Sequence, residues 1–224
     1  MPRFIRDNGL TLFFLLLFLC SLAGQAVAGF AEFNDQQLVQ GGATITFGDY
    51  LTSSDFAVDT AENWQSEYLQ FLLLIYLTVW LVQRGSPESK PVGKIGPESD
   101  AEQRVAAHAR PGSPDAARLR GLPGTLFGHS LGLLMGAVFA LSWLAQSIAG
   151  RAAYNAQRIE QLQDPVGWLA YVTGADFWSR TLQNWQSEFL AVASMAIFAV
   201  YLRQRGSPES KPVGESHGAT DAGD

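Results

Sequence analysis

The chain repeats itself with a period of 121 residues. Aligned without a gap, residues 8–93 and 129–214 are identical at 35 of 86 positions. The pentapeptide NWQSE occurs at 63–67 and again at 184–188, and the undecapeptide QRGSPESKPVG occurs at 83–93 and 204–214. Such self-similarity indicates a duplicated structural unit. Any fold proposed for the 224 residues must therefore contain the same unit twice.

Each copy of the repeat carries two apolar segments. Only 16% of the residues are charged and 47% are hydrophobic, yet the mean hydropathy is +0.06, so apolar and polar stretches must be segregated. A helix needs about 20 apolar residues to cross a bilayer. The sequence predicts such helices at residues 10–29, 63–82, 126–150 and 184–202.

These segments predict an all-α membrane protein with four transmembrane helices, arranged as two parallel duplicated helical hairpins. The first repeat occupies residues 1–93 and the second 125–214. Residues 94–124 are rich in Ala, Pro, Gly and Ser without an apolar period, which predicts a flexible cytoplasmic linker. The same reasoning predicts a disordered tail at 215–224.

The first apolar segment has an alternative interpretation as a secretory signal peptide. Arg3 and Arg6 precede a leucine-rich stretch that ends at the A-x-A sequence 26–28. The repeat favours a retained helix, because residues 126–150 are its second copy and lie in the middle of the chain.

The positive charges predict the orientation. Cytoplasmic loops carry the excess of Lys and Arg, and twelve of the fifteen basic residues fall at residues 3–6, 84–120 and 203–211. The loop at 30–62 contains no Lys or Arg. Both termini and the linker are therefore expected in the cytoplasm. The outer loops contain amphipathic stretches, FAEFNDQQLVQ and RAAYNAQRIEQLQ, which predict interfacial helices; Gly41 and Gly42 would end the first.

The NWQSE pentapeptide predicts a polar layer near the outer ends of the helices. Thr60 and Thr181 are candidate N-caps just before it, and Trp64 and Trp185 are candidate interfacial anchors. The predicted layer consists of Gln25, Asn63, Glu67, Gln146, Asn184 and Glu188. A carboxylate near hydrocarbon needs a partner or water. The layer either joins the helices by hydrogen bonds or forms a site for a cation, a proton or a polar ligand between Glu67 and Glu188.

The undecapeptide begins where the second helix of each hairpin ends. Its charged positions include Arg84 and Lys90 in the first copy and Arg205 and Lys211 in the second. Arginine at a helix C-terminus, followed by Gly and Pro, is typical of a helix stop at the cytoplasmic interface. A cytoplasmic docking motif is the alternative.

Motifs for catalysis and cofactor binding are lacking in this sequence. There is no nucleotide-binding glycine pattern, no catalytic triad repeated in both copies, and no metal spacing among the single Cys and three His. A net charge of −6 argues against a nucleic-acid partner. We expect no enzymatic activity, no metal and no cofactor.

The residues NWQSE(F/Y)L, QRGSPESK, NGL before the first helix and GQAVAG at its end resemble a group of bacterial membrane proteins, the domain-of-unknown-function family 6766. The resemblance covers residues 4–213. It implies a multi-pass membrane protein in a bacterial cytoplasmic membrane, and it brings no activity or substrate. We expect a non-enzymatic structural or partner-binding component of the lipid bilayer, with a homo-oligomer or a membrane protein as partner. The alternatives are a small ion, proton or solute transporter or channel using Glu67 and Glu188, and an envelope-stress protein acting on lipids through the outer loops.

Overall fold

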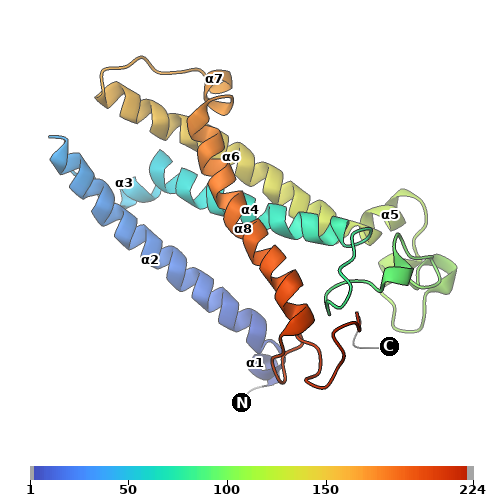
Figure 1. Cartoon of the computed structure of the whole chain (residues 1–224). Coiled ribbons are helices and arrows are strands. Elements are labelled where there is room, and N and C mark those ends of the chain that lie inside the picture. The colour runs from blue at the N-terminus through green and yellow to red at the C-terminus, as the bar shows by residue number, and fades with distance from the viewer. Residues whose placement is uncertain (1–2, 221–224) are drawn as a thin grey trace. The chain divides into compact units, whose positions relative to one another are not determined.

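A computed structural model describes residues 3–220, and its regular structure is helical throughout this range (Figure 1). The α-helices are α1 (Arg3–Asp7), α2 (Gly9–Val39), α3 (Phe47–Leu51), α4 (Ser54–Leu77), α5 (Leu122–Gly128), α6 (Ser130–Glu160), α7 (Trp168–Val172) and α8 (Ala175–Tyr201). Short 3₁₀ helices at Ala106–His108 and Asp115–Arg118 lie in the predicted linker, and one at Val92–Lys94 lies across its start. The flexibility of the linker stays a prediction.

Helices α2 and α6 are both long and apolar enough to span a membrane. Each has 31 residues. Helix α2 contains the predicted segment 10–29, whereas α6 contains only residues 130–150 of the predicted segment 126–150, because residues 126–128 belong to the separate helix α5. Neither helix stops there, because the amphipathic stretches continue it to Val39 and to Glu160. The chain leaves α2 at Gly41, whose φ of +78° belongs to the left-handed region that glycine adopts without strain.

Helices α4 and α8 begin earlier than the sequence predicted. They start at Ser54 and Ala175, so Thr60 and Thr181 lie inside helices and are not N-caps. The hydroxyl of Ser53 accepts a hydrogen bond from the Phe56 N–H at 3.2 Å and begins α4 instead. Both copies of NWQSE are helical, as predicted.

The end of α4 also differs from the prediction, at residue 77 instead of 82. The chain leaves the helix through tight turns, in which Trp80 N–H donates to Leu77 O at 3.0 Å. The linker contacts the segment that follows α4, because Gly96 N–H donates a hydrogen bond to Val79 O at 2.8 Å.

The described residues form two compact units, 3–60 with 145–168 and 61–144 with 169–220. In the first unit, one asparagine in each repeat holds the loop that follows the long helix. Asn34 exchanges two hydrogen bonds with the backbone of Ile45, and Asn155 does the same with Val166. The side-chain amide thus pairs with the loop backbone as a peptide group of a neighbouring β-strand would, because it offers both a donor and an acceptor.

The first unit is further ordered by Tyr50, which is 3% exposed. Its ring contacts Phe30, Phe33 and Phe56, with centroids 5.6 to 6.1 Å apart. Gly29 allows this arrangement, since a Cβ atom there would lie 2.1 Å from the Tyr50 hydroxyl. Burial and the nearby Asp59 and Asp55 carboxylates raise the pKa of Tyr50.

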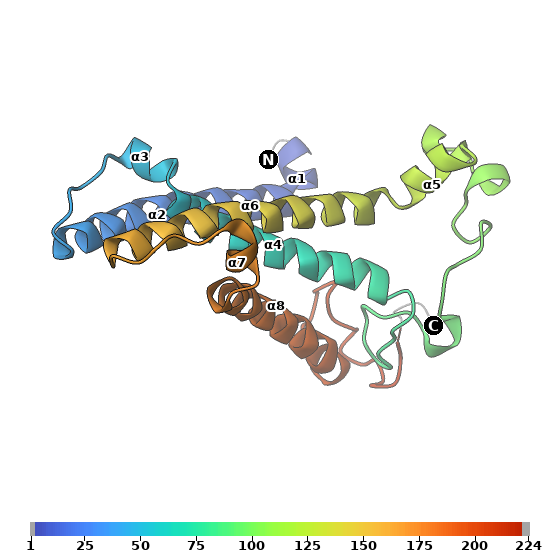
Figure 2. The same ribbon diagram turned by 90° about the horizontal axis from the view of Figure 1, so that it is seen from above.

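In the second unit, α4 packs along the first half of α6, and the two helices run side by side in both views (Figures 1 and 2). The contact uses two glycines one helical turn apart. A Cβ atom on Gly132 would lie 2.7 Å from the ring of Tyr76, and one on Gly136 would lie 3.6 Å from Leu72. Paired small residues of this kind let helix backbones approach closely.

An aromatic cluster, centred on Trp143, packs α6 against α8 in the same unit. Its rings belong to Phe139, Trp143, Phe177, Trp178 and Trp185. The repeat partners of Trp143 and Trp178 are Leu22 and Ala57. The cluster is therefore a property of the second copy and not of the repeat.

Candidate functional site

The NWQSE pentapeptides meet in the second unit, where the first copy lies on α4 and the second on α8. The indole N–H of Trp185 donates to Gln65 Oε1 at 2.8 Å. Gln65 is completely buried, and Ser66 is 2% exposed. Buried positions on α4 recur at residues 61, 65 and 69, which is the spacing of one helical face.

An ion pair joins the same two helices. Arg180 Nε lies 2.7 Å from Glu62 Oε2, and the side chains are 36% and 15% exposed. The repeat partners of these residues are Asp59 and Gln183, which have other charges. Like the aromatic cluster, this pair distinguishes one copy from the other.

The two glutamates proposed as a site also lie in this unit. Glu67 is exposed and Glu188 is half-buried, and the two carboxylates interact electrostatically. Asn63 is exposed, while Asn184 donates a hydrogen bond to Arg180 O at 3.0 Å within its own helix. Asn63 and Glu67 thus lie on a different face of α4 from the buried Gln65 and Ser66.

The remaining predicted layer residues, Gln25 and Gln146, belong to the first unit. Gln25 is half-buried on α2, and Gln146 is completely buried on α6. Of the two predicted anchors, Trp64 is 41% exposed, whereas Trp185 takes part in the aromatic cluster. Sequence reasoning chose the layer from the face that Asn63 and Glu67 share and from the depth of Gln25. It missed Gln65, which lies on the buried face of α4 with Ala61 and Leu69 at four-residue spacing.

The two undecapeptides adopt the same local structure. Gly85 and Gly206 have φ values of +86° and +85°. The hydroxyls of Ser89 and Ser210 accept hydrogen bonds from the N–H groups of Gln83 and Gln204, each at 2.8 Å. The identical residues thus build the same turn twice, and the left-handed glycines make it possible.

The lysines of the two undecapeptides bind groups within the protein. Lys211 is 1% exposed, and its Nζ donates to the carbonyl oxygens of Ser216, His217 and Ala219, each at 3.0 Å. Burial and the positive charge of Arg203 lower the pKa of Lys211. Lys90 instead pairs with Glu98 at 3.0 Å.

The C-terminal residues 215–220, part of the predicted disordered tail, pack against the first undecapeptide. Gly85 N–H donates to the Thr220 hydroxyl at 3.2 Å, and a Cβ atom on Gly85 would lie 2.2 Å from His217 O. Burial and the hydrogen-bonded neighbour Glu209 raise the pKa of Glu88, which joins the two undecapeptides. Arg84 and Arg205 are exposed. Residues 221–224 lie outside the described range.

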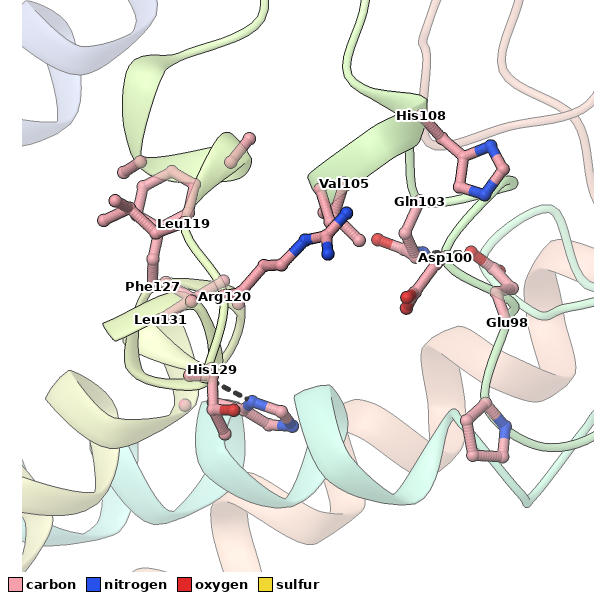
Figure 3. Close-up of a pocket in the computed structure, with 18 of the residues that line it drawn as sticks. Glu98, Asp100, Gln103, Val105, His108, Leu119, Arg120, Phe127, His129 and Leu131 are labelled. Atoms are coloured by element: carbon pink, nitrogen blue, oxygen red, sulfur yellow. Dashed lines mark hydrogen bonds between the residues drawn. The ribbon is translucent and has the colours of Figure 1, made fainter. Parts of the chain in front are cut away.

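A large open cavity lies beside the linker in the second unit, with a volume of about 1030 Å³ (Figure 3). One wall is apolar and comes from the end of α4 and the start of α6, with Tyr76, Trp80 and Leu131 among its residues. The other wall comes from the linker and carries polar residues among apolar ones such as Val105 and Leu119; we call it the polar wall. Sequence reasoning missed this cavity, because the linker has no apolar period that would indicate a folded wall.

The polar wall carries both signs of charge. Its ionisable residues are Lys90, Glu98, Asp100, His108, Arg120 and His129. The Lys90–Glu98 pair is internally neutral, and His129 Nδ1 lies 2.9 Å from the Thr125 carbonyl. Within residues 3–220, no group of three or more His, Cys, Asp and Glu side chains is placed to hold a metal ion.

Comparison with protein families finds one match, a domain of unknown function, DUF6766, over residues 1–222. No curated protein and no solved structure matches the chain.

Proposed function

Since the chain belongs to the DUF6766 family, whose function is unknown, we propose that it is a non-enzymatic membrane scaffold. It spans a bacterial cytoplasmic membrane four times, with its termini and linker in the cytoplasm, and it binds a membrane protein or a second copy of itself. Its two hairpins are held together by fixed polar contacts. The observation that carries this proposal is that two polar side chains of α4, Gln65 and Glu62, bind Trp185 and Arg180 of α8.

Surface composition supports spans by α4 and α8 as well as by α2 and α6. These helices have 24 and 27 residues, enough for about 30 Å of hydrocarbon at 1.5 Å per residue. Phe71 is 45% exposed, and Leu190 and Phe198 are 64% and 55% exposed. Soluble proteins rarely expose so much contiguous apolar surface, whereas a bilayer would cover it.

The proposed orientation predicts opposite accessibility of two positions. A cysteine replacing the exposed Gln40, just after α2, should react with a membrane-impermeant maleimide added outside intact spheroplasts. A cysteine replacing the exposed Ala101, in the linker, should react only after permeabilisation. Both variants are made with Cys20 replaced by serine, because this native cysteine is exposed. The reverse labelling pattern would refute the orientation.

The electrostatic contact between Glu67 and Glu188 favours one other function, cation or proton transport. Two carboxylates of like charge at one depth of a membrane attract a cation. The scaffold and transport proposals differ in the ion flux that they predict. A scaffold, in which the contacts between the hairpins stay fixed, should give no flux.

A flux assay separates the two functions. Purified protein in liposomes should give the same K⁺, Na⁺ and proton flux as empty liposomes, both as the natural chain and as the Glu67→Gln/Glu188→Gln variant. Thermal unfolding of both proteins is the control for folding. Flux through the natural chain that the double variant loses would overturn the scaffold proposal in favour of transport.

A further inference from the structure

We propose that the cavity beside the linker binds the headgroup of a zwitterionic phospholipid, a phosphate joined to an ammonium group, with the acyl chains along the apolar wall. This inference rests on the proposed function as a membrane protein, which places the cavity at a surface of the bilayer.

The two walls match the two parts of such a lipid. The end of α4, the turns after it and the start of α6 present Tyr76, Trp80 and Leu131, and Trp80 is 53% exposed. Exposed apolar side chains of this kind suit contact with acyl chains. The linker adds charged and amide side chains among apolar ones such as Val105 and Leu119, so the cavity offers polar and apolar contacts together (Figure 3).

The charges within the polar wall fit a headgroup that carries both signs. In Figure 3, the guanidinium of Arg120 extends into the cavity from the α5 side, and the carboxylate of Asp100 comes from the opposite side. Both side chains are exposed, and the described structure records no ion pair for either of them. Arginine binds phosphate through two parallel hydrogen bonds, and a carboxylate binds an ammonium group.

The alternative ligand chemistries fit less well. A purely anionic headgroup would leave Asp100 facing a negative charge, whereas a cation alone would leave Arg120 without a partner. The volume of about 1030 Å³ also exceeds that of a free phosphate and lies at the upper end of the range for small-molecule sites. One headgroup with a segment of its acyl chains accounts for both the charge pattern and the size.

The test measures lipid binding by the full-length protein in detergent, using native mass spectrometry at a series of lipid concentrations. Phosphatidylethanolamine should bind the natural protein at least about tenfold more tightly than it binds Arg120→Ala. The matched control is Arg110→Ala, which removes the same charge from the linker at a residue that does not line the cavity. Arg120 is exposed, so its replacement should leave thermal unfolding unchanged.

A second variant tests the role of the ammonium group. Asp100→Asn should weaken binding of phosphatidylethanolamine and leave binding of the anionic phosphatidylglycerol unchanged or improved. Equal affinities of the natural protein for the two lipids would overturn the proposal, and so would equal effects of Arg120→Ala and Arg110→Ala. Binding of soluble glycerophosphoethanolamine as tight as that of the lipid would also overturn it, because acyl chains would then contribute nothing.

This measurement is independent of orientation, since it is made in detergent. If the cysteine at position 101 is labelled from outside while lipid binding depends on Arg120, the proposed orientation fails and the lipid site remains. If labelling agrees with the orientation but lipid binding is insensitive to Arg120, the lipid site fails alone.

Discussion

Replacing Gly132 by alanine should destabilise the protein by about 2–3 kcal/mol, the upper part of the range for inserting a methyl group into a tightly packed contact. The new Cβ atom would lie 2.7 Å from two ring carbons and the hydroxyl oxygen of Tyr76. Relieving this clash requires the Tyr76 side chain to leave its packed rotamer or α4 and α6 to separate, and either change loses packing between the helices. Denaturant titration in mixed micelles, followed by circular dichroism, measures the loss.

The neighbouring glycine supplies the control. At Gly136 a Cβ atom would lie 3.6 and 3.8 Å from the Leu72 methyl groups, which is ordinary contact. Gly136→Ala should therefore be neutral or stabilising, because alanine favours a helix interior by about 1 kcal/mol over glycine. Adding Tyr76→Ala to Gly132→Ala should remove the clash and recover part of the loss. Equal stability of the two single alanine variants would show that the close approach is not tight.

Reversing the charge of Arg180 should destabilise the contact between α4 and α8 by about 3 kcal/mol, because Arg180→Glu leaves two carboxylates facing each other in a partly buried position. Glu62 is the less exposed partner, at 15%, so the loss of its counter-ion accounts for most of the destabilisation. The double exchange Glu62→Arg/Arg180→Glu should restore most of the stability. The same denaturant titration measures all three proteins.

Arg205→Glu provides a matched control, since Arg205 is exposed and lies outside the helix contact. It should change stability by less than about 0.5 kcal/mol. If the double exchange is no more stable than Arg180→Glu alone, the ion pair does not join the helices in solution.

Sequence repetition accounts for the parts of the structure that are local. The Asn34 and Asn155 contacts, the Gly85 and Gly206 turns and the continuation of α2 and α6 into the amphipathic stretches depend on nearby residues. Identical sequence segments therefore adopt the same conformation. The helix boundaries of α4 were predicted less well, because Ser53 is an ordinary serine in sequence, and only its position before the first turn makes it the start of the helix.

Contacts between the copies could not be predicted from the repeat. In the first copy of NWQSE the glutamine is buried, and in the second the tryptophan is the residue that reaches it. The choice depends on which face of each helix meets its neighbour, and this is decided by residues outside the pentapeptide. The cavity likewise depends on the path of the linker, which no periodic pattern indicates.

The asymmetry between Glu62 and Arg180 has a consequence for how the hairpins choose partners. If two first hairpins met in the same geometry, Glu62 of one would face Asp59 of the other, since Asp59 is the counterpart of Arg180. Two second hairpins would place Gln183 opposite Arg180 and leave the guanidinium without a counter-ion. The first hairpin therefore pairs better with the second than with another first hairpin, and the second pairs better with the first than with another second. This specificity arises as much from the unfavourable charges in the wrong pairs as from the ion pair in the right one. The residues at these two positions therefore make the two halves of the chain complementary and not interchangeable.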